Sequence, residues 1–321
     1  MPEKEHLTEA RWWEMFSDFA TRQWELTPAL NRIVRSAYLA EMRAHLFKPG
    51  GRLLEIGCGS GWAGIEVARQ GMSLTGVDTS EMQVAKARVF ARRAGLANAR
   101  FVVGTVSTLD SQVRHDGILI HAVLHHLGEN DICTLLTEAQ ARLADGGHLY
   151  IYEPLTAERP GILLRALAFL VFLCVWSPWW LLHELGIRLR IGPPAFRDAA
   201  RQGWTGLSPN ERPPDQDWLL SRLKALGMEG DVRYWHAYSL AFAMGCSELR
   251  PPLSLLAQLI ARGLYWLDQW LLQTPLRDYI LGVWTFAAIK VTSREGTERF
   301  EHRPGQQWTK THGPINPVNR V

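Results

Sequence analysis

The feature that most constrains this chain is a short apolar run, Leu53 to Ile56, that leads directly into a glycine-rich loop ending at Gly61. Glycine at alternate positions lets the backbone turn sharply and approach a ligand closely at the end of a strand. From this loop to about residue 155, short apolar runs alternate with amphipathic stretches, as strands and crossover helices do. The sequence therefore predicts an α/β fold with a binding loop after its first strand.

Strands and helices are expected at definite positions along the chain. Ser80 followed by Gln83 is a capping box, which predicts a helix to about Ala94 before Gly95. Another helix is expected from Asn130 or Asp131 to Ala144. The expected strands are 53–56, 73–77, 101–103, 117–120, 148–153, 232–244 and 283–291, and further helices are expected over 217–226 and 253–273.

These elements suggest five regions. They are an N-terminal helical cap (1–48), a binding core (49–155), an apolar lid or membrane-associating insertion (156–230), strands and an amphipathic helix that complete the core (231–292), and a disordered tail (293–321).

The insertion contains 17 uncharged positions, residues 166–182, with Pro178 near their end. A membrane-spanning helix needs about 20 apolar residues, so an interfacial or re-entrant segment is preferred to a span. The chain has 14 Trp, clustered outside the binding core, and such rings favour a membrane interface or an apolar ligand. The same surface could instead be a buried helix, a pocket lining or a dimer interface.

Composition narrows the functional classes. A net charge of only +3 over 321 residues does not indicate a nucleic-acid partner. The four Cys form no CxxC pair, which argues against a zinc site and a disulfide framework. The N-terminus is polar where a signal peptide would be apolar. We therefore expect a cytoplasmic protein, with peripheral contact to the inner face of a membrane as a further possibility, and leave its oligomeric state open.

The glycine loop has two interpretations. Residues 59–64 satisfy GxGxxG, the dinucleotide fingerprint, and Asp78 follows where a ribose-binding acid is expected, so an NAD(P)-dependent oxidoreductase is one alternative. However, Glu55 precedes Gly57 by two residues and gives ExGxGxG. A carboxylate there would repel a pyrophosphate and suits a cationic ligand.

The string LLEIGCGSG resembles the first motif of class I S-adenosylmethionine-dependent methyltransferases, and GVDTSEMQVAKAR, DGILIHAVLHHL and ARLADGGHLYIYEP resemble later motifs of its quinone and small-molecule branch. The resemblance implies a Rossmann-like, seven-stranded, mostly parallel sheet with an antiparallel last strand and a helical apolar lid. It also implies S-adenosylmethionine as the cofactor.

The resemblance assigns roles to individual residues. Glu55 would hold the methionine end of the cofactor and Asp78 its ribose, although an acid here is also an ordinary helix cap. Thr105 stands where the family usually has an Asp, which leaves the adenine contact to a hydroxyl or to the backbone around Val106. The full set expected to bind cofactor is Glu55, Gly57, Cys58, Gly59, Gly61, Asp78, Thr79, Met82, Thr105, Val106 and His121.

His121, His125 and His126 follow the fourth strand and are the candidate catalytic residues. Methyl transfer is an in-line displacement, so the protein aligns the reactants and removes a proton when the acceptor is a hydroxyl. Histidine suits that role because its pKa is near neutrality. Alternatively, these side chains only shape the loop. No carboxylate or thiolate cluster accompanies them, so no metal site is expected.

The sequence thus predicts methyl transfer from S-adenosylmethionine to a hydrophobic small molecule or lipid, with oxygen as the favoured acceptor atom. The alternatives are the oxidoreductase described above and a non-catalytic, membrane-associated scaffold, which the missing Asp at Thr105 suggests.

Overall fold

The computed structural model describes most of the chain outside the N-terminus, the insertion and the tail. The described residues are 12–13, 26–156, 185, 189, 208, 210–246, 249–275, 277, 285–293, 299–301 and 309–311. The apolar segment 166–182, and with it most of the expected lid, lies outside these residues.

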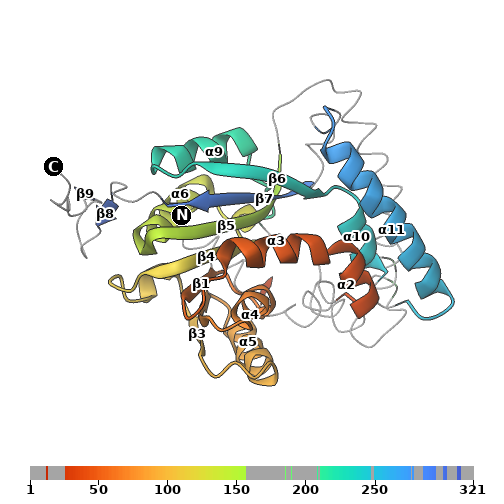
Figure 1. Ribbon diagram of the computed structural model, residues 1–321, viewed down its shortest axis with the longest axis horizontal. Helices are drawn as coiled ribbons and strands as arrows, with labels where there is room; N and C mark the ends of the chain where they lie inside the picture. The colour runs from red at the N-terminus through yellow and green to blue at the C-terminus, as the bar shows by residue number, and fades with distance from the viewer. Residues whose placement is uncertain are drawn as a thin grey trace, which may run out of the picture. The chain divides into compact units, whose positions relative to one another are not determined.

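A seven-stranded sheet organises the fold (Figure 1). Its strands are β1 Arg52–Ile56, β2 Ser73–Asp78, β3 Ala99–Val103, β4 His115–His121, β5 Leu143–Leu155, β6 Gly230–His236 and β7 Thr285–Thr292, in the order β3-β2-β1-β4-β5-β7-β6. Strand β1 runs parallel to its two neighbours, β2 and β4. Strands β2 and β3 also run parallel, and so do β4 and β5. Figure 1 draws β7 opposite in direction to β6. The predicted mostly parallel sheet with an antiparallel last strand is confirmed.

The described helices follow the expected alternation with the strands. They are α2 Pro28–Val34, α3 Ser36–Leu46, α4 Trp62–Ala68, α5 Glu81–Arg93, α6 Glu129–Arg142, α9 Gln216–Ala225, α10 Ser239–Gly245 and α11 Leu253–Leu272, with short 3-10 turns η1 Val106–Thr108 and η2 Leu124–His126. The Ser80 hydroxyl accepts a hydrogen bond from the Gln83 amide, 3.3 Å away, so Ser80 caps α5 as predicted. The reciprocal half of the capping box is wrong, because the Ser80 amide donates to Asp78 (2.8 Å) and not to the Gln83 side chain. In the tail expected to be disordered, strands β8 Arg299–Glu301 and β9 Thr309–Thr311 pair antiparallel.

The strand order places a binding site. From β1 the chain steps through α4 to β2, whereas from β4 it steps through α6 to β5, in the opposite direction along the sheet. Crossovers are right-handed, so α4 and α6 cover opposite faces. The carboxyl ends of β1 and β4 then flank a crevice at the point where the order reverses, which is where open α/β sheets bind ligands.

The chain divides into two compact units. The first comprises Met1–Glu41, Glu153–Gln216 and Arg233–Ala288, and the second comprises Met42–Tyr152, Asp217–Val232 and Ile289–Val321. Helices α2, α10 and α11 pack together in the first unit. The sequence analysis expected the strands and amphipathic helix of residues 231–292 to complete the core, and this division into regions stays a prediction.

The expected strand over 232–244 is wrong in its second half. Strand β6 ends at His236 and helix α10 begins at Ser239. The reason is Asp268 of α11, whose carboxylate accepts hydrogen bonds from the amides of Tyr238 (3.0 Å) and Ser239 (2.9 Å) and from the Ser239 hydroxyl (2.6 Å). These bonds satisfy the first amides of a helix. Their donor and acceptor are about 30 residues apart, so periodicity alone does not reveal them.

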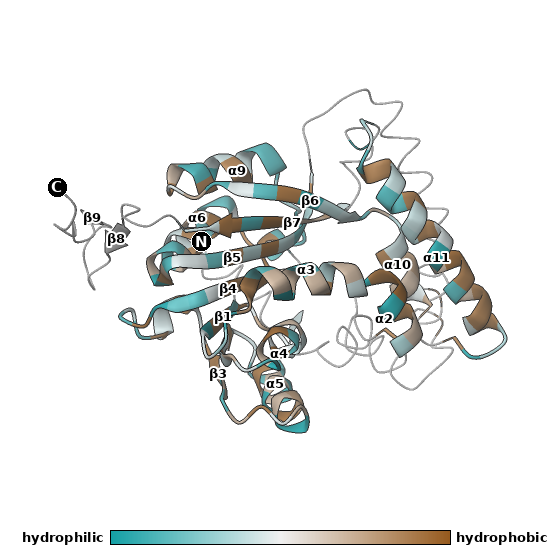
Figure 2. Ribbon diagram, viewed as in Figure 1, coloured by the Kyte–Doolittle hydropathy of each residue, from teal (hydrophilic) through white to brown (hydrophobic). Residues whose placement is uncertain are grey.

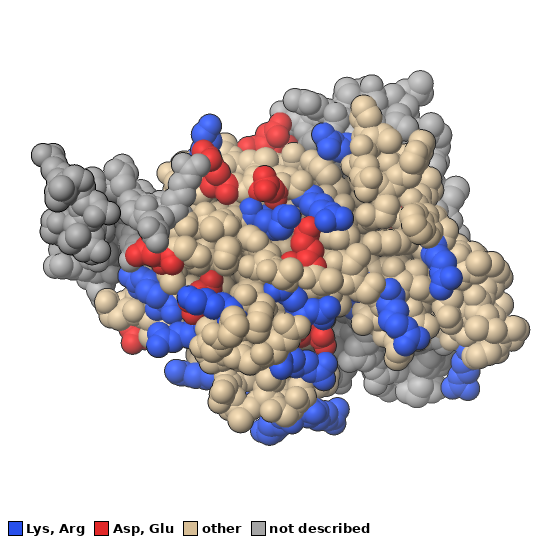
Figure 3. Space-filling view, in the orientation of Figure 1, with Lys and Arg blue, Asp and Glu red and all other residues tan. Residues whose placement is uncertain are grey.

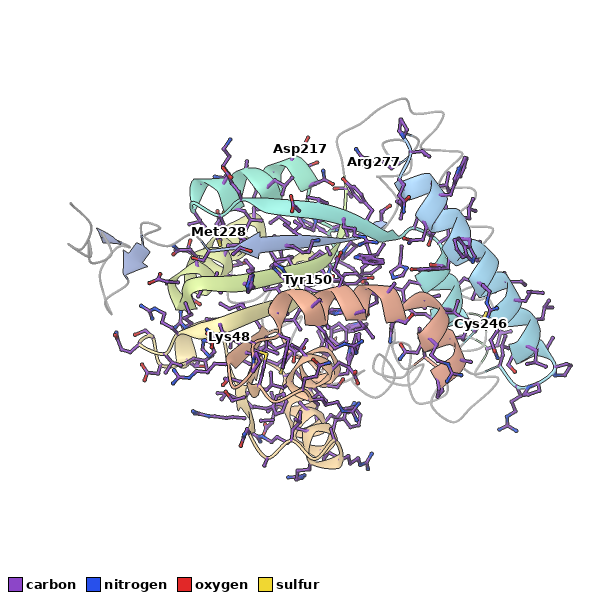
Figure 4. The ribbon with its side chains drawn as sticks, in the orientation of Figure 1. Lys48, Tyr150, Asp217, Met228, Cys246 and Arg277 are labelled. Carbon is purple, nitrogen blue, oxygen red and sulfur yellow. The ribbon has the colours of Figure 1, made fainter. Side chains whose placement is uncertain are left out.

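Replacing Asp268 by alanine is expected to lower the free energy of unfolding by about 3 kcal/mol, because it leaves buried amides without an acceptor. Asp268 is fully buried, and burial raises its pKa to about 6. Urea unfolding measures the loss. The control is Asp217→Ala on exposed α9 (Figure 4), which should cost no more than about 0.5 kcal/mol. Equal losses for the two variants would contradict this role for Asp268.

Candidate functional site

The glycine loop after β1 has three positions with left-handed backbone. A Cβ on Gly57 (φ 64°) would lie 2.5 Å from Val123, and one on Gly61 (φ 75°) would lie 2.9 Å from Phe101. These two glycines therefore allow close packing inside the protein. Gly59 (φ 50°) differs, because a Cβ there would meet no atom within 4 Å. Gly59 is thus the loop residue whose surroundings have room for a ligand.

Asp78, at the end of β2, is bonded to the same loop. Its Oδ2 accepts a hydrogen bond from the Gly59 amide and its Oδ1 accepts one from the Ser80 amide, each at 2.8 Å. Each carboxylate oxygen has a second lone pair, so both can also accept from a pair of ribose hydroxyls. Burial raises the pKa of Asp78, and the nearby His126 opposes that effect.

Glu55 lies beneath the loop and is 2% exposed. Its Oε1 accepts a hydrogen bond from the Gly64 amide in the first turn of α4 (3.0 Å). Among the described residues, its Oε2 has no hydrogen-bond partner. Burial raises the pKa of Glu55 to about 8, with a further contribution from Asp78. Glu55 therefore positions α4, which the sequence did not indicate, and retains one oxygen that a cationic group could satisfy.

Gly64 leaves space for the Glu55 carboxylate, which a larger residue at this position would displace. A Cβ at this position would lie 2.4 Å from Oε2 of Glu55. Packing between α4 and β1 therefore explains Gly64, the last glycine of the apparent GxGxxG fingerprint.

The other residues expected around the adenine are found near Asp78. Thr79 is exposed and Met82 is 48% exposed, so both side chains are accessible to a flat ring. The Gly104 amide donates to the Asp78 carbonyl (2.8 Å) and brings the loop after β3 alongside. In that loop the Thr105 hydroxyl is hydrogen-bonded to the Ser107 hydroxyl, 2.7 Å away. Val106 is 3% exposed and packs inside the protein.

Cys58 contributes through its backbone. Its amide donates to the Val77 carbonyl (3.0 Å) and links the loop to β2. The side chain is 4% exposed, and burial raises the pKa of its thiol well above the usual value. The side chain is accordingly a neutral, packed thiol.

The three histidines occupy different environments at the end of β4. His121 is 8% exposed, stacks on Tyr152 with ring centroids 4.8 Å apart, and meets the edge of Trp62 at 5.0 Å. His125 is 3% exposed. His126 is half-buried and close enough to Asp78 to influence its pKa.

The turn between these histidines is strained. Ala122 has φ 56°, the only non-glycine residue with positive φ among the described residues, and its amide donates to the Tyr152 carbonyl (2.8 Å). Strained backbone is often found at functional sites. Trp62, Ala122 and Tyr152 are site residues that the sequence analysis missed, although all three lie within the motifs that it quoted.

All the expected site residues belong to the second unit and lie around the carboxyl ends of β1 to β4. Among the described residues there is no group of three or more His, Cys, Asp or Glu able to hold a metal ion. The arrangement offers an open position at Gly59, a carboxylate suited to a ribose, and a half-buried imidazole whose charge acts on that carboxylate.

Comparison with known proteins agrees with this geometry. Residues 53–147 match a family model described as a methyltransferase domain. A ubiquinone biosynthesis O-methyltransferase from Paramagnetospirillum magneticum is 33% identical over 121 residues, which cover 34% of this chain and 47% of the relative. The chain thus spans about half the length of the curated relatives it matches.

Solved structures share the fold. The 1,6-didemethyltoxoflavin-N1-methyltransferase of Burkholderia thailandensis has a TM-score of 0.53 at 16% identity and covers 92% of this chain and 91% of its own. The cyclopropane synthase MmaA2 of Mycobacterium tuberculosis has a TM-score of 0.51 at 14% identity, with 80% and 83% covered. At these identities the likeness concerns the fold alone, and the names of the two proteins describe different activities.

Proposed function

We propose that this chain transfers a methyl group from S-adenosylmethionine to oxygen on a hydrophobic small molecule or lipid. The match of residues 53–147 to a family model described as a methyltransferase domain supports the proposal. The observation that carries the proposal is the pair formed by Gly59 and Asp78. Gly59 leaves room for a ligand. Asp78 accepts a hydrogen bond from the Gly59 amide and keeps further lone pairs for the ribose hydroxyls.

The residues present fit this cofactor. Gly59 would allow close approach, Asp78 would bind the ribose hydroxyls, and Met82 and Thr79 would lie against the adenine. Glu55 has a buried oxygen without a partner among the described residues, which suits the cationic methionine end. When bound, the cofactor supplies an electrophilic methyl group on a sulfonium sulfur.

The chain's own task is to align the acceptor and accept its proton. We infer that His126 is the base, because it is half-buried and its charge acts on the Asp78 carboxylate. His121 is packed against Tyr152 and Trp62 and forms the wall of the site. His125 is buried and supports the turn.

A quinone-type hydroxyl is the acceptor class that we favour. The curated relatives at 30% and 33% identity are named ubiquinone biosynthesis O-methyltransferases, which supports an oxygen acceptor on an apolar ring. The cytoplasmic location stays a prediction from the sequence. No helix among the described residues is long and apolar enough to cross a membrane.

The proposal is tested by incubating the full chain with deuterated-methyl S-adenosylmethionine and lipid extract or hydroxylated quinone precursors, followed by mass spectrometry. We expect a labelled methyl ether, and its loss in Asp78→Ala. Binding of S-adenosylhomocysteine without any labelled product would overturn transfer and support the scaffold alternative. Binding of NAD in its place would overturn the cofactor assignment.

The role of the base gives a separate prediction. His126→Asn should lower kcat about 100-fold with little change in S-adenosylhomocysteine affinity, because a general base acts on the transition state. Steady-state kinetics on the identified acceptor measures the loss. His125→Asn is the neighbouring control and should lower kcat only a few-fold. The reverse order of effects would assign the base to His125.

A further inference from the structure

We propose that helix α11 docks the first unit onto a lipid surface that contains anionic headgroups. The inference concerns a surface outside the methyltransferase domain and does not rest on the proposed reaction. It is carried by three features of the described residues: the face that α11 exposes, the aromatic side chains on that face, and the charges around it.

Helix α11 is apolar on its outer side. Its buried positions include Asp268 as well as Ala257, Ala261 and Leu272. Its exposed large hydrophobic residues are Leu253 (56%), Leu255 (62%), Leu256 (54%), Leu259 (68%), Ile260 (41%), Trp266 (70%), Leu267 (39%) and Trp270 (58%). Surface helices normally place their apolar stripe toward the core and their charges outward. On α11 the single carboxylate faces inward and the large apolar side chains face outward.

The exposed residues form one continuous stripe. Leu256, Leu259, Trp266 and Trp270 are spaced by three, four or seven residues, so they follow one side of an α-helix. Gly263 lies among them, and a Cβ there would meet no atom within 4 Å. Figure 2 shows brown, hydrophobic residues along much of α11. A stripe of this size on a surface indicates a binding partner.

The surrounding charges favour a membrane as that partner. Arg250 before the helix, Arg262 within it and Arg277 after it are all exposed. Figure 4 labels Arg277. Between residues 249 and 277, the described part of the chain has no exposed Asp or Glu. Figure 3 likewise shows Lys and Arg, and no Asp or Glu, over α11 on the face in view. Exposed arginines beside an apolar face complement anionic headgroups.

Trp266 and Trp270 add a preference for the interface over the hydrocarbon interior. The indole ring is amphipathic and concentrates at the level of the headgroups. The helix also contains Arg262 and the buried Asp268. These observations describe a helix that lies in the plane of the interface.

The proposal is tested by flotation of the full chain with vesicles of phosphatidylcholine, with and without phosphatidylglycerol. We expect flotation with the anionic vesicles and weaker flotation at high salt. Trp266→Ser/Trp270→Ser should lower the partition coefficient at least about tenfold, because two large rings leave the interface. Arg262→Gln should lower it roughly fivefold on anionic vesicles only.

Trp218→Ser on α9 is the matched control and should float like the unmodified chain. Intact S-adenosylhomocysteine binding in every variant shows that the folds survive and separates this test from that of the proposed function. Sedimentation to the bottom with both vesicle types would overturn the proposal. So would a dimer in analytical ultracentrifugation that the double variant dissociates while neither protein floats, since the partner would then be a second copy of the chain.

Discussion

Replacing Gly59 by alanine is expected to lower the affinity for S-adenosylhomocysteine about 10- to 100-fold while the protein stays folded. The added methyl group would meet no protein atom within 4 Å, so the only contact that it can disturb is the one with a ligand. Overpacking a close contact by one methyl typically costs about 1–3 kcal/mol. Isothermal titration measures the affinity, and thermal unfolding without ligand measures the stability.

Gly95→Ala provides the matched control. Gly95 also has a left-handed backbone (φ 74°) with no atom within 4 Å of a Cβ, but it follows α5, away from the loop. Both variants should therefore show the same backbone strain, about 1 kcal/mol, and only Gly59→Ala should lose affinity. Unchanged binding in Gly59→Ala would show that the ligand does not approach this loop. Gly57→Ala is unsuitable here, because its clash with Val123 would disturb the fold.

The sequence predicted the strands and helices from β1 to β5 well, because their signals are local. Apolar runs marked the strands, Ser80 and Gln83 marked the start of α5, and glycines marked the turns. The mostly parallel sheet and its antiparallel last strand followed from resemblance to a family, since nothing local distinguishes a parallel from an antiparallel neighbour. The strand order was not predicted and comes from the structure.

The errors and omissions arose where contacts between distant residues decide the structure. The run 232–244 alternates like a strand, yet Asp268 starts helix α10 at Ser239. The cluster of Trp62, His121 and Tyr152 draws one ring from each of three segments. The register between β4 and β5 pairs His121 with Tyr152, and Trp62 comes from the first residue of α4. A motif assigns a role to one residue at a time and therefore missed these neighbours.

Glu55 shows the same limit in the candidate site. Its place in ExGxGxG predicted a contact with the methionine end of the cofactor. The structure adds a hydrogen bond to the Gly64 amide and full burial, both of which depend on how α4 packs on β1. Glu55 can both position α4 and contact the cofactor, and its ionisation distinguishes these two roles.

Glu55→Gln is expected to become more stable, relative to the unmodified protein, as pH rises. Burial raises the folded-state pKa of Glu55 from its usual 4.5 to about 8. Between these values the folded chain holds a proton that the unfolded chain has released. The contribution of Glu55 to stability is therefore fully present below pH 4.5, and it declines as pH rises to 8. The limiting slope is about 1.4 kcal/mol per pH unit.

Glutamine retains an oxygen for the Gly64 amide and does not titrate. Any change in the free energy of unfolding that the substitution itself causes is the same at every pH, and so it does not affect the pH dependence. The difference in the free energy of unfolding between variant and unmodified protein should change by about 3 kcal/mol from pH 5 to pH 7.5. Urea unfolding across this range measures it. Asp268, whose pKa is also raised, contributes equally to both proteins and drops out of the difference, whereas the interaction between Asp78 and Glu55 is part of that difference. A difference that is constant with pH would show that Glu55 is ionised throughout.

The same pair of proteins then decides whether Glu55 meets the cofactor. A cationic methionine end near Oε2 would stabilise the carboxylate and lower its pKa. Linkage then requires that affinity for S-adenosylhomocysteine rise with pH below 8, by up to about tenfold per unit, and that Glu55→Gln lose this rise. If the stability difference varies with pH while the affinity difference does not, Glu55 acts only by positioning α4. The methionine end would then be held by other residues of the loop.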